Sequence, residues 1–340
     1  MADLRDTRVL VLGLGLLGGG AATVNWLLDH GASVTVADRR DEHELAASVR
    51  RVLTHLRRSS RDGAEHDERI SRLSWALGNE SADLLTDVAL LVANPAIPGD
   101  HPLIEAANER GIPVTNEANL FYSAWRGLTV GITGSRGKTT TVRWANHLIP
   151  RSVAVGNAPE SPFLAPTGSR PLRVAVTELP SFLLERFAHA PKVAVVTNVY
   201  RDHLDRHGTM EQYAATKARL FASQRPGDTL ILNADDQWTA QFTAMRPAAT
   251  VLVHSHSPLA PGRAGLWHAD GALWQLSGGF ARRMLAVPTF AHRWGAHNVS
   301  NLMAAVLAAR TLGVSWTEIG RRVRTLPEIP FRQQVMRKTA

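Results

Sequence analysis

A glycine-rich segment followed by lysine and threonine carries the strongest chemical signal in the sequence. It reads GITGSRGKTT over residues 131–140, after an apolar run and before helix-forming residues. Gly134 and Gly137 would let backbone amides face phosphate oxygens. Lys138 could neutralise phosphoryl charge, and the Thr139 hydroxyl could ligate Mg²⁺. The glycine spacing differs from the standard phosphate loop and a turn without a ligand is the alternative, but the segment predicts a nucleotide-phosphate site.

A second glycine pattern lies near the N-terminus. Residues 13–18 read GLGLLG, and Asp38 stands 20 residues after Gly18. Taken alone, this matches the dinucleotide fingerprint and favours a nicotinamide dehydrogenase. The pattern specifies only a tight turn at a helix N-terminus, however, and such a turn can meet any diphosphate, including that of a nucleotide sugar. A glycine turn without a ligand remains a further alternative.

Acidic and imidazole side chains follow two further apolar runs. Glu178 comes directly after one run, and Asp202, His203 and Asp205 follow the next. Because the carboxyl ends of neighbouring parallel strands line one crevice, Thr139, Glu178 and His203 are expected to converge there. Each residue alone would more often be a helix cap or a surface polar group. Their order after the glycine-rich segment favours ligands around a phosphate.

The elements that must position these residues alternate between strand and helix. Residues 8–38 are typical of a strand, a glycine turn, a helix and a second strand. Apolar runs at residues 174–176, 193–196 and 229–232 predict further buried parallel strands. Residues 296–312 have apolar side chains at helical spacing and predict a helix.

These patterns predict an α/β fold of two domains. A Rossmann-like parallel sheet is expected over residues 1–127, and a central P-loop-type α/β ATPase domain over residues 128–325. The last segment, residues 326–340, is expected to be a stub that leads to an absent third domain.

Composition excludes several classes of protein. Of 340 residues, 44% are hydrophobic and 20% charged, which is a globular balance. No apolar run is long enough to span a bilayer, and the first residues do not resemble a secretory signal, so we expect a cytoplasmic protein that binds no membrane. The absence of cysteine excludes disulfides and thiolate metal sites.

The formal charge of +8 raises the question of nucleic acid binding. Only four of the 38 basic residues are lysine, and the arginines are scattered without interleaved aromatic residues. One cluster, at Arg50, Arg51, Arg57, Arg58 and Arg61, is followed by acidic residues and is interpreted as a solvated helical face. We therefore expect no nucleic acid partner.

The order of the motifs resembles that of the Mur ligases, over about residues 5–332. Within the family, it resembles the branch that joins D-glutamate to UDP-N-acetylmuramoyl-L-alanine. The segments that carry this resemblance are GITGSRGKTT, ELPSFLLE, TNVYRDHLDRH, YAATKARLF, LNADD and GAHNVSNLMAA.

The resemblance implies specific residue roles. The ATP-binding residues would be Gly134, Gly137, Lys138, Thr139, Thr140, Asn298 and Asn301. Two Mg²⁺ sites would use Thr139, Glu178 and His203, and the catalytic residues would be Lys138, His203 and Lys217. Lys217 falls where these ligases carry a carbamylated lysine, whose anionic oxygens suit Mg²⁺. UDP-sugar and substrate contacts would come from Gly13, Gly15, Leu16, Leu17, Gly18, Asp38, Arg39 and Asn157.

The implied reaction has two steps. The substrate carboxylate attacks the γ-phosphate of ATP to form an acyl phosphate, and the amine of D-glutamate then displaces phosphate. The sequence departs from the family pattern at Leu17, where a threonine commonly faces the diphosphate, and at Arg136, Pro180, Leu183 and Phe331. Two hypotheses follow: a ligase that lacks its third domain through truncation, gene splitting or supply of that domain by a separate C-terminal polypeptide, or a noncatalytic relative that binds a UDP-sugar or nucleotide. A dehydrogenase is the third.

Overall fold

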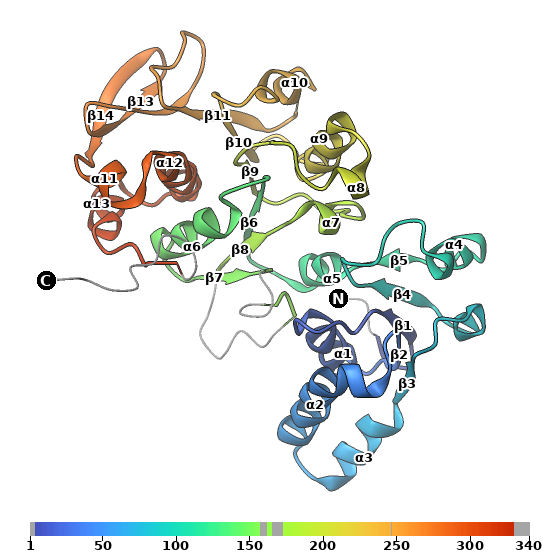
Figure 1. Ribbon diagram of the computed structural model, residues 1–340. Helices are drawn as coiled ribbons and strands as arrows, with labels where there is room; N and C mark the ends of the chain where they lie inside the picture. Colours follow the sequence, from blue (N-terminus) through green and yellow to red (C-terminus); the bar gives the residue numbers. More distant parts are fainter. Residues whose placement is uncertain (1–3, 157–161, 165–172, 246, 330–340) are drawn as a thin grey trace, which may run out of the picture. The chain divides into compact units, whose positions relative to one another are not determined.

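Two β-sheets organise the chain, each in its own unit. The computed structural model describes residues 4–156, 162–164, 173–245 and 247–329 (Figure 1). The N-terminal unit comprises the described residues of Met1–Arg126, Gly156–Gly168 and Glu185–Phe187, and the C-terminal unit comprises the others. Among the described residues, no helix has both the length and the apolar character needed to cross a membrane.

The N-terminal unit contains a five-stranded parallel sheet in the order β3-β2-β1-β4-β5. The order reverses between β1 and β4, which opens a ligand crevice at their carboxyl ends in folds of this type. Its elements are β1 (Arg8–Leu12), α1 (Gly19–Asp29), β2 (Ser33–Asp38), α2 (Glu42–Ser59), α3 (Gly63–Ser71), β3 (Leu73–Leu77), η1 (Ala82–Leu85), β4 (Leu90–Ala93), α4 (Pro102–Glu109), β5 (Val114–Thr115) and α5 (Glu117–Ala124).

Side-chain alternation along β1 explains why this sheet is covered on both faces. Val9 and Val11 pack in the cluster that includes α1 and α2. Leu10 and Leu12 pack in the opposite cluster with α4. Successive strand residues point to opposite faces, so a strand with an unbroken apolar run, such as β1, must be covered on both faces of the sheet.

The C-terminal unit contains a nine-stranded sheet in the order β14-β13-β12-β11-β10-β9-β6-β8-β7. Strands β6 to β12 pair in parallel with their neighbours among themselves. Strand β13 pairs antiparallel with β12 and with β14. Its elements are β6 (Leu128–Thr133), α6 (Lys138–Leu148), β7 (Ser152–Val155), β8 (Val174–Glu178), α7 (Ser181–Leu184), β9 (Val193–Val196), α8 (Leu204–His207), α9 (Met210–Ala218), β10 (Thr229–Asn233), α10 (Thr239–Ala244), β11 (Thr250–Ser255), β12 (Gly265–Ala269), β13 (Ala272–Ser277), β14 (Phe280–Ala286), α11 (Phe290–Trp294), α12 (Ala296–Thr311) and α13 (Trp316–Val323).

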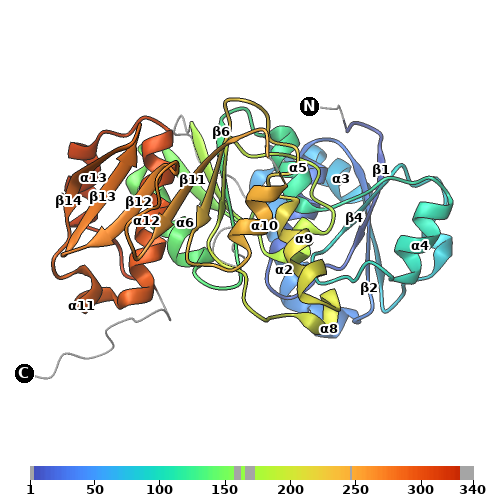
Figure 2. The same cartoon turned by 90° about the horizontal axis from the view of Figure 1, so that it is seen from above.

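Helix α12 forms the centre of the larger core. Most of its residues are buried, and it packs on α6 and on β9 to β12, as the view from above shows for β11 and β12 (Figure 2). A helix that is apolar on nearly every side belongs inside a protein. The two asparagines on this helix, Asn298 and Asn301, are therefore buried polar groups that require partners.

The structure confirms the predicted α/β fold class, the buried strands and the helix at α12. Strand β6 lies between β8 and β9. The segments that follow these three strands therefore leave the sheet at the same edge, and they carry the polar residues singled out above.

Candidate functional site

The turn between β6 and α6 has the backbone of an anion-binding loop. We call residues 134–137 the glycine-rich loop. Gly134 has φ +148° and Gly137 has φ +82°. A Cβ on Gly134 would lie 1.9 Å from Thr197 Oγ1, and one on Gly137 would lie 2.2 Å from Asn301 Oδ1. Both positions therefore require glycine, and the loop delivers the chain to the N-terminus of α6, where anions are favoured.

Two residues that the sequence did not single out hold this loop. Asn198 Oδ1 accepts a hydrogen bond from Arg136 N at 2.8 Å, and Asn198 Nδ2 donates to Arg136 O at 3.0 Å. Thr197 Oγ1 also donates to Arg136 O, at 2.7 Å. Their place directly after β9 is the sequence signal that could have identified them, because a segment at that edge can reach the neighbouring loop.

Lys138 closes over the glycine-rich loop. Its Nζ donates to Gly134 O at 2.9 Å and to Ser135 O at 3.2 Å. The ammonium therefore lies over the backbone that would surround a phosphate. An anion bound in the loop would be within reach of this charge, as the sequence predicts.

The side chains of Thr139 and Glu178 form a hydrogen bond next to the glycine-rich loop. Thr139 Oγ1 donates to Glu178 Oε1 at 3.1 Å. Glu178 is buried at the end of β8, where its Cα pairs in register with Ile132 of β6. The parallel register thus places a carboxylate beside the first turn of α6, where Thr140 is also buried.

His203 and Lys217 join the site through Tyr213. The Tyr213 hydroxyl lies 3.1 Å from Ser135 Oγ in the glycine-rich loop. The ring centroid of Tyr213 lies 6.5 Å from that of His203 and 4.2 Å from Lys217 Nζ. His203 has φ +51°, a conformation that is uncommon for a residue with a side chain. A continuous series of contacts therefore links Lys138 to His203 and Lys217.

Lys217 is a buried amine in an unusual environment. Its side chain is fully buried, and its Nζ has no hydrogen-bond partner among the described residues. Burial, and secondarily the charge of Lys138, lowers the pKa of Lys217 well below its usual value, while Asp202 opposes the shift. The neutral amine is thus favoured, and a neutral amine is a nucleophile.

The asparagines of α12 form a chain of hydrogen bonds that reaches α6. Asn301 Oδ1 accepts from Thr141 Oγ1 at 3.2 Å, and Asn301 Nδ2 donates to Asn298 Oδ1 at 2.7 Å. Asn298 Nδ2 donates to Trp294 O at 2.7 Å. These amides are engaged inside the protein, so the role that the structure gives them is to link α12 to α6, with Asn301 lying next to Gly137 of the glycine-rich loop. Contact of Asn298 and Asn301 with a nucleotide stays a prediction.

The donor set fits Mg²⁺ bound together with a nucleotide. Within the part of the chain that the structure describes, no group of three or more His, Cys, Asp or Glu side chains is placed to hold a metal ion. Thr139 and Glu178 nevertheless bring a hydroxyl and a carboxylate oxygen together. Mg²⁺ accepts such a small protein contribution, because it keeps several waters and binds substrate phosphates. The assignment of two Mg²⁺ sites, with His203 as a ligand, stays a prediction.

The N-terminal glycine turn, residues 13–18, is held by Asp38. Asp38 Oδ2 accepts a hydrogen bond from Gly15 N at 3.1 Å, and its Oδ1 accepts from Arg40 N at 3.0 Å. The buried carboxylate therefore fixes the shape of the turn. Contact of Asp38 with a ligand stays a prediction.

The remaining residues predicted for the UDP-sugar differ in their exposure. Gly13, Gly15 and Gly18 all have positive φ. Leu16, Leu17 and Arg39 are exposed. Asn157 lies outside the described residues, as does Phe331.

Both units match domains of known proteins. Residues 132–309 match the Mur ligase middle domain, and residues 7–116 match the MurD-like N-terminal domain of Mur ligases. The UDP-N-acetylmuramoylalanine–D-glutamate ligase of Roseiflexus sp. is 33% identical over 99% of this chain and 71% of its own length. The ligase of the same name from Anaeromyxobacter dehalogenans is 35% identical over 98% of this chain and 70% of its own.

Solved structures agree on the fold. The UDP-N-acetylmuramate:L-alanyl-gamma-D-glutamyl-meso-diaminopimelate ligase from Neisseria meningitides matches with a TM-score of 0.59 at 16% identity, over 96% of this chain and 99% of that chain. A murein peptide ligase from Psychrobacter arcticus matches with a TM-score of 0.57 at 15% identity, over 97% of this chain and 70% of that chain.

Proposed function

The chain belongs to the Mur ligase family of ATP-dependent ligases, and we propose that it joins D-glutamate to UDP-N-acetylmuramoyl-L-alanine in the synthesis of peptidoglycan precursors. The observation that carries this proposal is the meeting of Thr139 Oγ1 and Glu178 Oε1 beside Lys138. The family match favours a nucleotide sugar over a nicotinamide cofactor at the N-terminal glycine turn.

The chemistry proceeds by two displacements. The carboxylate of the nucleotide-sugar substrate attacks the γ-phosphorus of ATP, the bond to the β-phosphate oxygen breaks, and ADP leaves. The amine of D-glutamate then attacks the acyl carbon, the amine loses a proton, and inorganic phosphate leaves. Both steps concentrate negative charge on oxygen atoms, so cations and backbone amides must face those atoms.

The residues of the C-terminal unit supply these interactions. Loop amides at 134–137 would bind phosphate oxygens, and Lys138 would exchange its contacts with Gly134 O and Ser135 O for the transferring phosphoryl group. Thr139 and Glu178 would hold Mg²⁺, which neutralises phosphate charge when bound. His203, whose ring lies beside Phe182 and Tyr213, would provide a further ligand of Mg²⁺.

Lys217 fits a carbamylated ligand. A neutral amine can add to CO₂, forming an N–C bond and losing one proton, which yields a carbamate anion. Lys217 has the depressed pKa and the unpartnered Nζ that this addition requires. The product would bring oxygen ligands to Mg²⁺ and place an anion, instead of a neutral amine, within the field of Lys138.

The reaction can be tested directly with purified protein. The chain is supplied with Mg-ATP, UDP-N-acetylmuramoyl-L-alanine and one amino acid at a time, and phosphate release is measured together with the mass of the amide product. The chain is assayed by itself and together with the part of the Roseiflexus relative that the match does not cover. The second format is included because we also propose a separate C-terminal polypeptide as a partner.

We expect phosphate release that requires the UDP-sugar and D-glutamate together. L-Alanine and L-lysine serve as controls for the incoming amino acid. Product with another amino acid but not with D-glutamate would overturn the substrate assignment. Bound Mg-ATP without product in either format would favour the noncatalytic alternative.

A further inference from the structure

An arginine on α2 contacts the N-terminal glycine turn from outside the glycine pattern. Arg51 Nη1 donates to Leu16 O at 3.0 Å and lies 3.3 Å from the position of a Cβ on Gly18. One helical turn earlier, Ser48 Oγ donates to Gly15 O at 2.7 Å. Helix α2 therefore holds two consecutive carbonyls of the turn and places a permanent positive charge beside it.

Two carboxyl groups lie near the turn that Arg51 contacts. The carboxylate of Asp38 binds Gly15 N, and Glu117 Oε2 lies 2.9 Å from the position of a Cβ on Gly19 at the start of α1. The exposed side chains of the turn, Leu16 and Leu17, are apolar. A diphosphate would therefore meet backbone amides and nearby carboxyl groups, with no polar side chain from the turn itself.

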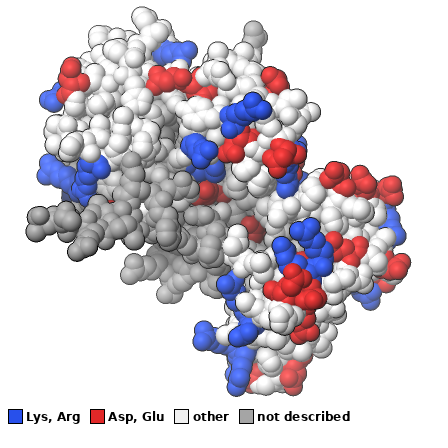
Figure 3. Space-filling model, viewed as in Figure 1, with Lys and Arg blue, Asp and Glu red and all other residues white. Residues whose placement is uncertain are grey.

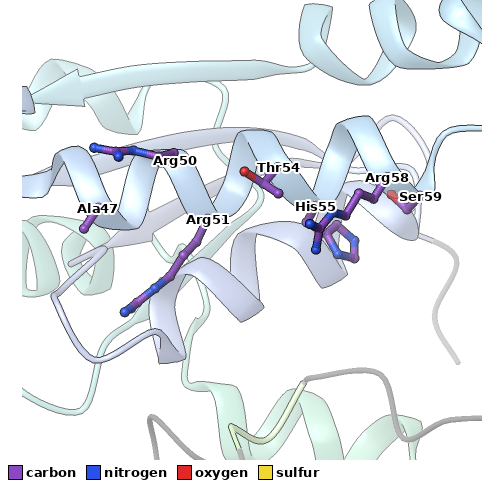
Figure 4. A pocket seen from close by; sticks show the side chains of 7 residues that line it. All are labelled: Ala47, Arg50, Arg51, Thr54, His55, Arg58 and Ser59. Atoms are coloured by element: carbon purple, nitrogen blue, oxygen red, sulfur yellow. The ribbon is translucent and has the colours of Figure 1, made fainter.

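Arg51 also belongs to a basic surface. A hollow of about 500 Å³ runs along α2. Figure 4 shows Ala47 and Arg50 at one end of the group that lines it, Arg58 and Ser59 at the other, and Arg51 between them with its side chain extending away from the helix. Basic side chains gather along this side of the N-terminal unit (Figure 3). The described residues that line the hollow are Ala47, Arg50, Arg51, Thr54, His55, Arg58 and Ser59.

We propose that Arg51 binds the diphosphate of the nucleotide-sugar substrate and supplies the polar contact that Leu17 cannot make. The inference rests on the proposed function and adds a specificity residue to it. One N–H of the guanidinium is bound to Leu16 O, and the exposed side chain carries further donors in a planar fork that matches phosphate oxygens. The interpretation of this arginine cluster as a merely solvated face is therefore revised for Arg51.

The test separates phosphate binding from base binding. UDP, UMP and uridine are titrated by calorimetry into the wild-type chain, Arg51→Ala, Arg51→Lys and Arg57→Ala. Arg57 is the matched control, because it is an exposed arginine in the last turn of the same helix and does not line the hollow. Mg-ATP is titrated into each variant to show that the C-terminal unit is intact.

We expect Arg51→Ala to weaken UDP binding by roughly tenfold to a hundredfold and to leave uridine binding unchanged. Arg51→Lys should retain part of the affinity, since a point charge remains without the fork. The Arg57→Ala variant should match the wild type.

Three results would overturn the inference. Equal UDP affinity of Arg51→Ala and the wild type would show that Arg51 does not touch phosphate. Equal losses of UDP and uridine affinity would assign Arg51 a purely structural role. A wild-type chain that binds Mg-ATP but not UDP would contradict the proposed substrate as well, and would thereby locate the failure in the proposed function.

Discussion

Thr139 Oγ1 and Glu178 Oε1 lie 3.1 Å apart although 39 positions separate the two residues in the chain. Thr139 belongs to the first turn of α6, and Glu178 ends β8. Strand β8 pairs with β6, the strand that precedes the glycine-rich loop. The sheet itself therefore delivers a carboxylate to the hydroxyl that follows Lys138.

Replacing this carboxylate should raise the Mg²⁺ concentration that ATP binding requires. For Glu178→Gln, we expect the Mg²⁺ concentration at half-maximal ATP binding to rise by about tenfold, because an amide is a weaker ligand than a carboxylate. Calorimetric ATP titrations at several Mg²⁺ concentrations measure this. Glu211→Gln, at an exposed position in α9, is the control. An unchanged Mg²⁺ requirement in Glu178→Gln would remove Glu178 from the metal site.

The glycine-rich loop should not tolerate a side chain at Gly137. Gly137→Ala places a methyl group 2.2 Å from Asn301 Oδ1 at φ +82°, so we expect a loss of about 1–3 kcal/mol in unfolding free energy together with loss of ATP binding. Gly278→Ala is the matched control, since it has φ +58° and no atom within 4 Å of its Cβ position. Urea denaturation compares the two. Equal losses would mean that Asn301 does not restrict the loop.

Carbamylation of Lys217 can be observed without turnover. Protein incubated with ¹³C-bicarbonate should show a carbamate carbon signal by NMR, because burial lowers the pKa of Lys217 and thereby favours the neutral amine that adds to CO₂. The signal should disappear in Lys217→Arg and persist in Lys192→Arg, whose ammonium is paired with Asp228. A signal that survives in Lys217→Arg would place the modification elsewhere.

Stability should depend on pH through Glu117. Burial raises the pKa of Glu117 from 4.5 to about 7, opposed by a hydrogen bond with Thr23. The folded state thus holds this proton more tightly than the unfolded state, and the stability present below pH 4.5 is lost as pH rises towards 7. Because the side chain is partly exposed, we expect a loss of about 1–3 kcal/mol.

The Glu117→Gln variant isolates this effect, because glutamine cannot ionise. Unfolding free energies of wild type and Glu117→Gln are compared from pH 4.5 to pH 8. The variant should gain relative stability across that interval and hold the gain above pH 7. A difference between the two proteins that does not vary with pH would show that Glu117 titrates normally.

Sequence patterns predicted the parts of the site that depend on strand order. A glycine-rich turn and the ends of buried parallel strands mark one edge of a sheet, and this predicts that Lys138, Thr139 and Glu178 lie close together, as they do in the structure. The hydrogen bonds of Asn198 to Arg136 and of Asn301 to Thr141 could not be predicted, because they depend on side-chain directions across separate elements. Helical spacing predicts a solvated face for Arg51. It does not show that the guanidinium of this residue reaches Leu16 O in a turn that is far away in the sequence.

The central claim is that the glycine-rich loop binds the triphosphate of ATP, and calorimetric titration of Mg-ATP into three proteins tests it most directly. These are the wild type, Lys138→Ala, and Lys192→Ala as a lysine control whose Nζ binds Gly227 O and Asp228. We predict that Lys138→Ala weakens binding by roughly tenfold to a hundredfold and that Lys192→Ala binds like the wild type. Equal affinity of Lys138→Ala and the wild type would contradict the account.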